Sequence, residues 1–210
     1  NSTRIVKYDG QNVVNVEWPA IPSNADTFLF SDISENAIMH LSNKKATIID
    51  RINGKTLQSY SFPKSIVAAT LSFSNLVVAN ELNIIQVIKI NGLKQIKKFQ
   101  INKTTLFIAA TDEHIAVYLI DNSIYLFCVS DISSYKSLIL PAFTIPVSMS
   151  MFSEDLIIIG TNSGNIIKIT DNIETIVTQN FGDSKILLRP EYSKNSNLSI
   201  LCSGDPPFLI

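Results

Sequence analysis

The stretch Glu154–Thr170, which reads EDLIIIGTNSGNIIKIT, decides the fold that we expect for this chain. An acidic pair, Glu154-Asp155, leads into the apolar run Leu156–Gly160, and a second apolar run follows at Ile166–Ile169. Between the two runs lie four small polar residues, Asn162-Ser163-Gly164-Asn165. Two β-rich runs around a glycine-bearing turn predict a β-hairpin.

This pattern occurs three more times upstream. The central turns lie near Asn43, Glu81, Asn122 and Ser163, at intervals of 38, 41 and 41 residues. Each unit contains two dense apolar runs, a third run that is partly apolar, and a polar outer run. Ile, Val, Leu, Phe, Tyr and Thr dominate these runs, and no amphipathic run of helical period exceeds two turns. A four-stranded antiparallel unit that repeats about every forty residues is typical of a β-propeller blade.

We therefore expect an all-β chain, a single partial β-propeller with about four full four-stranded blades plus fragments, within a seven-bladed ring. Inner strands would be apolar on both faces because neighbouring blades stack on both sides, and the outer strand would face solvent. A solenoid or a β-sandwich is the alternative. The expected parts are the end of a preceding blade with a loop at 1–24, blades at about 25–62, 65–101, 104–142 and 146–181, and a truncated blade at 185–210.

Composition indicates a globular chain with a large core, because 46% of the residues are hydrophobic and 17% are charged. The formal net charge of −1 does not favour a polyanion or an anionic membrane surface. Lys94, Lys97 and Lys98 form the main basic cluster, and we interpret them, with Lys44-Lys45, as solvated strand edges that hinder aggregation. No apolar run approaches the roughly 18 residues that cross a bilayer, and no signal peptide is visible.

The chain begins at Asn1 without a methionine and ends at Ile210 inside an apolar run, so we expect a piece of a larger protein. Glycine is scarce, with seven residues, so Asn and Asp are expected at many turn positions that need a positive φ. Cys128 and Cys202 lie inside apolar runs and are interpreted as buried free thiols, with a disulfide as the alternative. Trp18 is expected to be a packing residue.

Enzyme motifs are missing from the sequence, which has no P-loop, G-x-G-x-x-G, H-E-x-x-H or G-x-S-x-G pattern. His40 and His114 are expected on strands at a blade face, without a set of metal ligands. Asp112-Glu113 and Glu154-Asp155 occupy equivalent turns, where an acid pair for hydrolysis can be imagined. We interpret them as polar loop residues. The sequence thus predicts no catalytic, cofactor-binding or metal-binding residue and no cofactor, with a propeller glycosidase as the enzymatic alternative.

The fourth unit carries a family resemblance. The run Pro146–Glu174, PVSMSMFSEDLIIIGTNSGNIIKITDNIE, resembles a blade of the large triple-propeller family, and Asn172–Thr175 is similar to the polar exit of such a blade. That family contains the damaged-DNA-binding protein large subunit, the large subunit of the cleavage and polyadenylation specificity factor, and a large subunit of splicing factor 3b. The collinear order of blades over Ala25–Ile210 carries the resemblance, although the loops are shorter here and the composition is richer in Ile and Asn.

The resemblance is strongest to the middle propeller of a fungal cullin–RING ligase adaptor in replication-stress repair. It implies a non-catalytic protein-interaction scaffold whose partners are a cullin amino-terminal domain and substrate receptors, in DNA repair or replication. It also implies a nuclear location, with the cytoplasm as a second compartment, no membrane contact and no direct nucleic-acid binding by this segment. The alternative is a scaffold of pre-mRNA 3′-end processing or splicing, because Pro206-Pro207-Phe208-Leu209 is similar to the polyadenylation factor's pattern.

Overall fold

The computed structural model describes most of the chain, and every regular element in the described part is a β-strand. The chain divides into two compact units, residues 1–66 with 91–93, and residues 67–90 with 94–210. Several residues singled out in the sequence, namely Trp18, Asp155, Gly164 and the exit at 172–175, lie outside the described residues. The described residues are 5–8, 13–16, 27–34, 36–140, 142, 144–154, 156–163, 165–170, 176–180, 185–190, 198–203 and 208–209.

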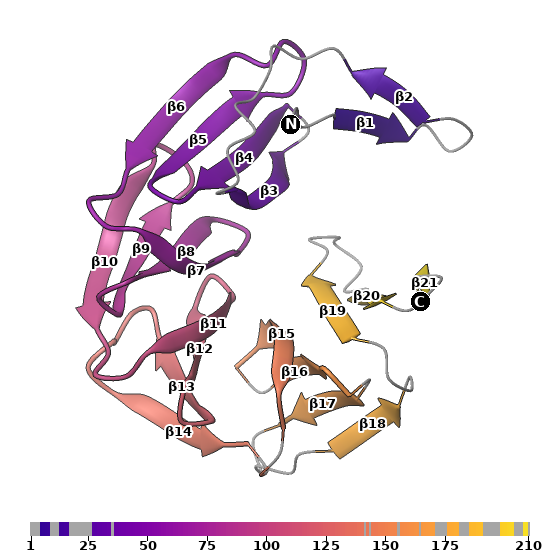
Figure 1. Cartoon of the computed structure of the whole chain (residues 1–210). Helices are drawn as coiled ribbons and strands as arrows, with labels where there is room; N and C mark the ends of the chain where they lie inside the picture. The colour runs from indigo at the N-terminus through magenta and orange to yellow at the C-terminus, as the bar shows by residue number, and fades with distance from the viewer. Residues whose placement is uncertain are drawn as a thin grey trace. The chain divides into compact units, whose positions relative to one another are not determined.

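The first unit contains one two-stranded and one four-stranded antiparallel sheet (Figure 1). β1 (Ile5–Tyr8) pairs with β2 (Val13–Val16). The four-stranded sheet, blade 1, has the order β3-β4-β5-β6. Its strands are β3 (Thr27–Ser34), β4 (Ala37–Ser42), β5 (Lys45–Asp50) and β6 (Thr56–Ser61).

The β5–β6 turn shows how short polar side chains form a hairpin here. Asp50 Oδ1 accepts hydrogen bonds from the backbone N–H groups of Ile52, at 2.8 Å, and Asn53, at 3.1 Å. Asn53 Oδ1 in turn accepts the N–H of Lys55 at 2.9 Å. Gly54 takes a φ of 69°, a conformation that costs little without a Cβ. The predicted Asn53-Gly54 turn is thus present.

The second unit begins with two further four-stranded sheets, and each runs in simple chain order (Figure 1). Blade 2 consists of β7 (Ile66–Leu71), β8 (Asn75–Asn80), β9 (Ile84–Lys89) and β10 (Lys94–Gln100). Blade 3 consists of β11 (Thr105–Ala110), β12 (His114–Leu119), β13 (Ser123–Cys128) and β14 (Tyr135–Ile139).

Blade 4 contains the hairpin that was predicted within Glu154–Thr170. Its strands are β15 (Pro146–Ser153), β16 (Leu156–Thr161), β17 (Asn165–Ile169) and β18 (Ile176–Asn180). β16 and β17 are antiparallel, with Gly160 opposite Ile166, as the apolar runs predicted. A three-stranded sheet follows, made of β19 (Lys185–Pro190), β20 (Leu198–Ser203) and β21 (Phe208–Leu209).

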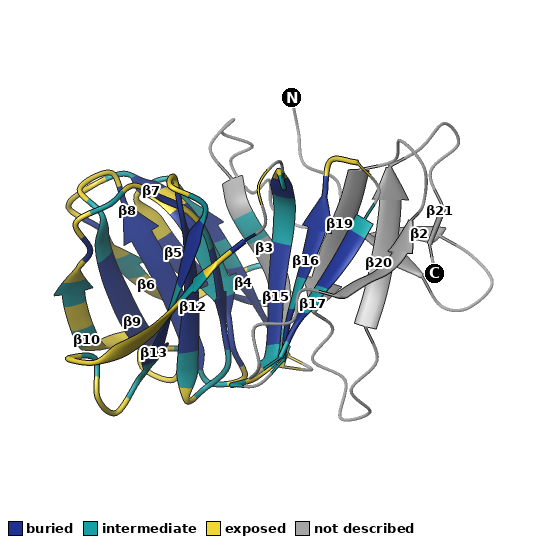
Figure 2. Cartoon of the chain, turned by 90° about the horizontal axis from the view of Figure 1, so that it is seen from below, coloured by how far each residue is buried: buried dark blue, intermediate teal, exposed yellow. Residues whose placement is uncertain are grey.

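In blades 2 and 3, the two central strands are the most buried and the fourth strand is the most exposed (Figure 2). All six residues of β8 are buried, whereas β10 has no buried residue. The first strand is intermediate, since β7 and β11 each mix buried, intermediate and exposed positions. Central strands have hydrogen-bonded neighbours on both edges and stacked side chains on both faces, which explains this order.

Blades 2, 3 and 4 share their cores through alternate residues of β12. Ile115, Val117 and Leu119 belong to a buried cluster with Val77 and Ile85 of blade 2. Ala116 and Tyr118 belong to a second cluster, which contains Met149, Ile157 and Ile167 of blade 4. Because successive strand side chains point to opposite faces, one strand serves two cores. The prediction that inner strands are apolar on both faces is confirmed.

Three non-glycine residues adopt a positive φ among the described turns. Asn83 and Asn122, with φ of 58° and 69°, confirm that asparagine takes turn positions where glycine is scarce. Leu93, with φ of 44°, was not expected. The predicted Asn91-Gly92 turn is present, but the left-handed residues are Gly92 and Leu93, so the turn is one residue longer than the dipeptide suggested.

Candidate interaction surface

One end of the strands in blades 2 to 4 collects the turns between second and third strands and the links between consecutive blades. We call this end the loop face. Backbone hydrogen bonds join its turns to its links. Ile101 donates to the carbonyl of Asn83 at 3.0 Å, Ile120 to Thr104 at 3.0 Å and Asn162 to Ile145 at 3.1 Å. These bonds satisfy backbone groups of the turns and links, and each of them fixes a turn to a neighbouring link.

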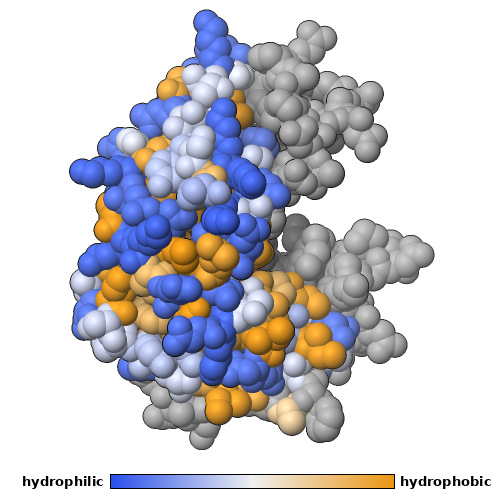
Figure 3. All heavy atoms as spheres, turned by 60° about the vertical axis from the view of Figure 1, so that its left-hand side comes forward, coloured by the Kyte–Doolittle hydropathy of each residue, from blue (hydrophilic) through white to orange (hydrophobic). Residues whose placement is uncertain are grey.

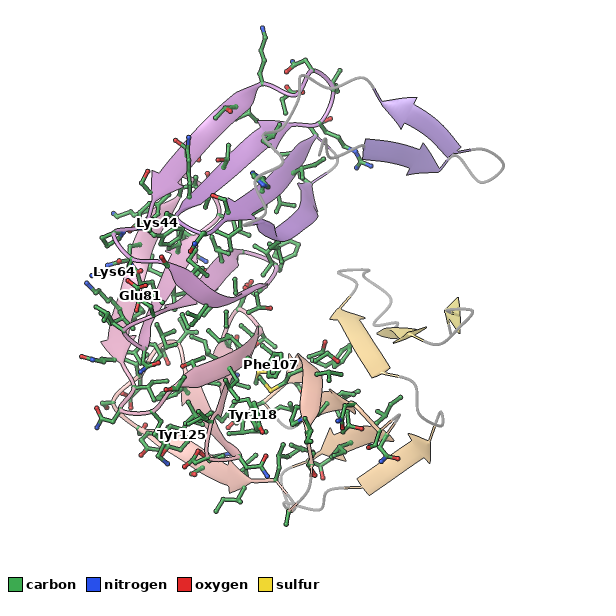
Figure 4. The ribbon with its side chains drawn as sticks, viewed as in Figure 1. Lys44, Lys64, Glu81, Phe107, Tyr118 and Tyr125 are labelled. Atoms are coloured by element: carbon green, nitrogen blue, oxygen red, sulfur yellow. The ribbon has the colours of Figure 1, made fainter. Side chains whose placement is uncertain are left out.

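Asparagine side chains strengthen these connections. Asn83 Oδ1 accepts the N–H of Thr105 at 3.3 Å, so the residue that turns blade 2 also holds the first strand of blade 3. Asn122 Oδ1 accepts the phenol hydroxyl of Tyr118 at 2.6 Å, and Asn122 Nδ2 donates to the carbonyl of Leu140 at 3.3 Å. Figure 4 shows Tyr118 close to Phe107 of β11, and their ring centroids are 5.9 Å apart.

Large apolar side chains are exposed along the loop face. Ile139 at the end of β14 is 72% exposed, and Ile120 in the β12–β13 turn is 64% exposed. Four more exposed apolar residues lie at the same end of the strands: Val67, Leu82, Leu106 and Ile145. Elsewhere in the described blades of this unit, the exposed large apolar side chains are Phe73 and Tyr135 at the opposite end and Ile96 in β10. Apolar surface also gathers in the middle and lower part of Figure 3, among polar groups.

A salt bridge lies among these apolar groups. Lys103 Nζ, in the link before β11, is 2.5 Å from Asp121 Oδ2 and 5.1 Å from the centroid of the Tyr125 ring. The hydrogen bond from Lys103, with a second from Ser123, lowers the pKa of Asp121 to about 2. The same bond raises the pKa of Lys103. Both groups therefore stay charged near neutral pH and supply a fixed polar contact beside the apolar side chains.

The opposite end carries two clasps between blades, each made by an acidic residue in the turn after the first strand. The first is Asp112. Its Oδ1 accepts Ser72 Oγ at 2.5 Å and the N–H of Ser74 at 2.8 Å, and its Oδ2 accepts Ser74 Oγ at 2.5 Å. Burial opposes ionisation of this carboxyl. The bonds from Ser72 and Ser74, with Lys89 nearby, outweigh that opposition, so the pKa of Asp112 is lowered.

The second clasp is Glu154, at the equivalent place in blade 4. Its Oε1 is 2.9 Å from Lys136 Nζ of β14, and its Oε2 is 3.3 Å from His114 Nε2 of β12. This clasp is more exposed than the first. Both acidic residues are polar loop residues, as expected, but each also reaches back to the preceding blade, which was not predicted. An acidic residue at the same place in two repeats was the available signal.

The structure does not combine the two acidic turns into a catalytic pair. Asp112 is held by serines of blade 2, and Glu154 is held by a lysine and a histidine of blade 3. In the described ranges, no group of three or more His, Cys, Asp or Glu side chains could hold a metal ion. Nor does any helix there have the length and apolar character to cross a membrane.

The two histidines and the two cysteines all lie in β-strands. His114 is the first residue of β12, and His40 lies in β4, where burial lowers its pKa. Cys128, at the end of β13, is a free thiol but is only partly buried, so the expectation of full burial is corrected. β13 ends at Cys128, so this side chain lies at the end of the blade and outside the core, with its Sγ 3.0 Å from Ser130 Oγ. Cys202 lies in β20, and its side chain is outside the described residues.

Four-stranded antiparallel sheets in simple chain order, with consecutive sheets stacked through shared cores, define a β-propeller. The expected fold class, all-β with four-stranded blades, is confirmed, and the solenoid and the sandwich are not found. The number of blades in the ring and the division of the chain into domains stay predictions.

A solved structure agrees with this fold. The chain is similar to the β-propeller domain of Cps50 (Swd1) from Myceliophteria thermophila, with a TM-score of 0.66 and 12% sequence identity. The match covers 87% of this chain and 64% of that domain, so this chain spans less than two thirds of the propeller that it resembles. No protein-family model matches the chain, and no curated protein matches it by sequence.

Proposed function

We propose that the chain is a non-catalytic protein–protein interaction scaffold, and that its loop face is the docking surface. The observation that carries this proposal is the row of exposed apolar side chains on hydrogen-bonded turns and links, with Ile120 and Ile139 the most exposed among them. A contiguous apolar surface with a polar surround is typical of a binding site. Rigid turns reduce the entropy that a partner must overcome on docking.

Within this class, we propose a part of a cullin–RING ubiquitin ligase adaptor acting in DNA repair or replication. The support is the resemblance of Pro146–Glu174, with the collinear blades, to the middle propeller of such adaptors. The partners would be a cullin amino-terminal domain and substrate receptors, in the nucleus. A helix or a terminal strand of the cullin domain would place apolar side chains against the loop face, with Lys103 and Asp121 offering polar contacts at its margin.

Affinity purification of the intact protein from its native cells, followed by mass spectrometry, tests this proposal. Recovery of a cullin supports the adaptor, whereas a preparation without a cullin overturns it. Ile139→Asp is expected to reduce recovery about 30-fold, since a central apolar contact contributes about 2 kcal/mol. Phe73→Asp, at a still more exposed position on the opposite end, is the matched control and should leave recovery unchanged. If both variants behave alike, the loop face is not the docking surface.

The second candidate is a scaffold in pre-mRNA 3′-end processing or splicing. The similarity of Pro206-Pro207-Phe208-Leu209 to the polyadenylation factor's pattern favours it. The same purification separates the two candidates, because polyadenylation or branch-site factors would be recovered in place of a cullin. The Ile139→Asp and Phe73→Asp pair would then report on the loop face for those partners.

A further inference from the structure

The outer strand of blade 2, β10, differs in charge from the other outer strands. β10 reads KQIKKFQ and carries Lys94, Lys97 and Lys98, whereas β6 (TLQSYS) and β18 (IVTQN) carry no charged residue. The single lysine of β14, Lys136, is paired with Glu154. Protection of an exposed edge is a general need of all outer strands. It therefore does not explain why the lysines gather on one of them.

The positive charge extends beyond the strand. From residue 82 to residue 111 the chain has five lysines, with Lys89 and Lys103 on either side of β10, and no acidic residue. Three of these lysines have an acidic neighbour from another turn: Lys89 near Asp112, Lys97 near Asp131 and Lys103 paired with Asp121. Lys94 and Lys98 are exposed, and in the described part of the chain neither has such a neighbour. A local positive surface thus lies on a chain whose net charge is −1.

β10 is also an edge strand with an available backbone. In the described residues it pairs with β9 alone, so its outward N–H and C=O groups have no strand partner (Figures 1 and 2). The strand is seven residues long, and its ladder is interrupted once, near Ile96. Such an edge can accept an additional extended strand through backbone hydrogen bonds. Four regular positions, Lys97 to Gln100, follow the interruption.

The two faces of β10 have different chemistry. Lys94, Lys97 and Phe99 pair with Lys89, Val87 and Ile85 of β9, and two of these, Val87 and Ile85, face blade 3. The opposite face carries Gln95, Lys98 and Gln100, with Gln95 bonded to Gln86 at 2.7 Å. An added strand would therefore meet two lysines and an aromatic ring on one face, and mainly amides on the other.

An aromatic cluster continues from Phe99 into blade 3. The ring of Phe99 lies 4.9 Å from Phe127, Phe127 lies 5.3 Å from Tyr135, and Tyr135 stacks on Tyr125 at 4.3 Å. Tyr135 is 52% exposed, so the cluster ends in an accessible aromatic face. Figure 4 shows Tyr125 on the outer side of blade 3, on the opposite side of its sheet from Phe107 and Tyr118. Exposed tyrosine on a rigid support is a frequent anchor for an apolar side chain.

From these observations we propose that β10 binds an extended, acidic segment of a partner protein by strand addition. Carboxylates of the segment would lie opposite Lys94 and Lys97, and an apolar side chain would lie against Phe99 and Tyr135. Like charges repel a second copy of β10, so the same lysines that prevent self-association select an acidic strand. This surface is separate from the loop face and does not depend on the proposed scaffold role or on its partner.

The test uses the whole protein and a fluorescein-labelled ten-residue peptide in which one face of the extended strand carries two glutamates next to three valines, with threonine at the alternate positions. Fluorescence anisotropy is expected to show saturable binding that weakens with added salt. Lysine in place of glutamate in the peptide should abolish binding. A peptide of the same sequence with alternate backbone amides methylated keeps the charge but cannot add as a strand, and it should also fail to bind. If the methylated peptide binds as well as the parent, the interaction is only electrostatic and the proposal is wrong.

Variants locate the site. Lys94→Glu combined with Lys97→Glu is expected to weaken peptide binding more than tenfold, because these two lysines share the face that meets the carboxylates of the segment. Lys94 is exposed, and Lys97 loses one exposed contact, with the carbonyl of Ser130 at 3.3 Å. Lys45→Glu combined with Lys55→Glu, the same charge change at two exposed positions of blade 1, is the matched control and should have little effect. Tyr135→Ala should weaken binding without changing its salt dependence. Equal binding by the lysine double variant and the wild type would overturn the proposal, and Ile139→Asp should leave peptide binding intact whatever it does at the loop face.

Discussion

Two blade interfaces share β12, and they are secured in different ways. At the interface of blades 2 and 3, Asp112 receives three short hydrogen bonds from the turn residues Ser72 and Ser74. At the interface of blades 3 and 4, Glu154 forms exposed contacts with Lys136 and His114. The apolar clusters beneath them are similar in kind. A repeated position thus keeps its place and its acidic side chain, while the groups that the side chain contacts change from serine hydroxyls to a lysine and a histidine.

The largest effect should come from the cores, and it should be similar at both interfaces. Ile115→Ala removes a fully buried side chain between blades 2 and 3, and Ile157→Ala does so between blades 3 and 4. Each is expected to lower the free energy of unfolding by about 3 kcal/mol, from lost transfer energy and the cavity left behind. Urea denaturation of the intact protein measures this change. Ile120→Ala, at an exposed turn, should stay within about 0.5 kcal/mol of wild type.

Asp112→Ala should have the next largest effect. It leaves the hydroxyls of Ser72 and Ser74 and the N–H of Ser74 without their acceptor, and Ser72 is buried. We expect a loss of about 2 kcal/mol by urea denaturation, since unsatisfied polar groups retain their desolvation cost. Asp131→Ala, an exposed aspartate bonded to serines of its own loop, is the matched control and should cost less. Equal losses would mean that the Asp112 clasp is no stronger than a surface turn.

Acid should weaken the Asp112 clasp selectively. The pKa of Asp112 is lower in the folded chain than its usual value, so its stabilisation is complete above the usual carboxyl range. It is lost as the pH falls through the lowered pKa. The difference in unfolding free energy between wild type and Asp112→Asn, which cannot ionise, should be constant above about pH 5 and should narrow in acid. A difference that does not change between pH 7 and pH 2.5, about the range where a carboxyl titrates, would contradict this assignment.

The smallest effect should come from the second clasp. Glu154→Gln removes the charge that contacts Lys136 and His114, and we expect a loss of about 0.5 kcal/mol at low salt, as for other exposed ion pairs. Added salt should reduce the difference from wild type, since exposed charges are screened. Parallel urea titrations in dilute buffer and in about 1 M sodium chloride measure this. If Glu154→Gln lowered the free energy of unfolding as much as Asp112→Ala does, and salt did not change that loss, the two clasps would not differ in strength as proposed.

Much of the fold could be predicted from the sequence because strand positions depend on local patterns. The apolar runs of Glu154–Thr170 correspond to β16 and β17, and Asn122 takes the left-handed turn position expected of it. Leu93 was not predictable in this way. A left-handed φ costs a leucine about 1–2 kcal/mol, and burial of its side chain, which is 6% exposed, offsets that cost. The conformation of this turn therefore depends on the tertiary packing of Leu93 and not on the local sequence alone.

The candidate surfaces were less predictable. Asp112 is 38 residues from Ser74 in sequence. The two residues meet only because they lie in equivalent turns of two consecutive blades. Ile120 and Ile139 are apolar residues at the ends of strands. A single sequence does not distinguish an apolar residue there that packs into the core from one that is exposed. Lys94, Lys97 and Lys98 fit the general pattern of edge protection, but the outer strands β6 and β18 carry no charged residue, so edge protection alone does not account for the lysines of β10. The structure supplies the fact that β6, β10 and β18 are the outer strands of their sheets and therefore occupy equivalent positions.

The double use of β12 has a consequence for how this part of the protein unfolds. Ile115 and Val117 form part of one core, and Ala116 and Tyr118 form part of the next. Every residue in the middle of β12 therefore packs into one of the two cores. If blade 3 opens, blades 2 and 4 each lose one wall of their core at the same moment. The three blades are therefore expected to melt as one cooperative block, with local fraying confined to outer strands such as β10 and β14.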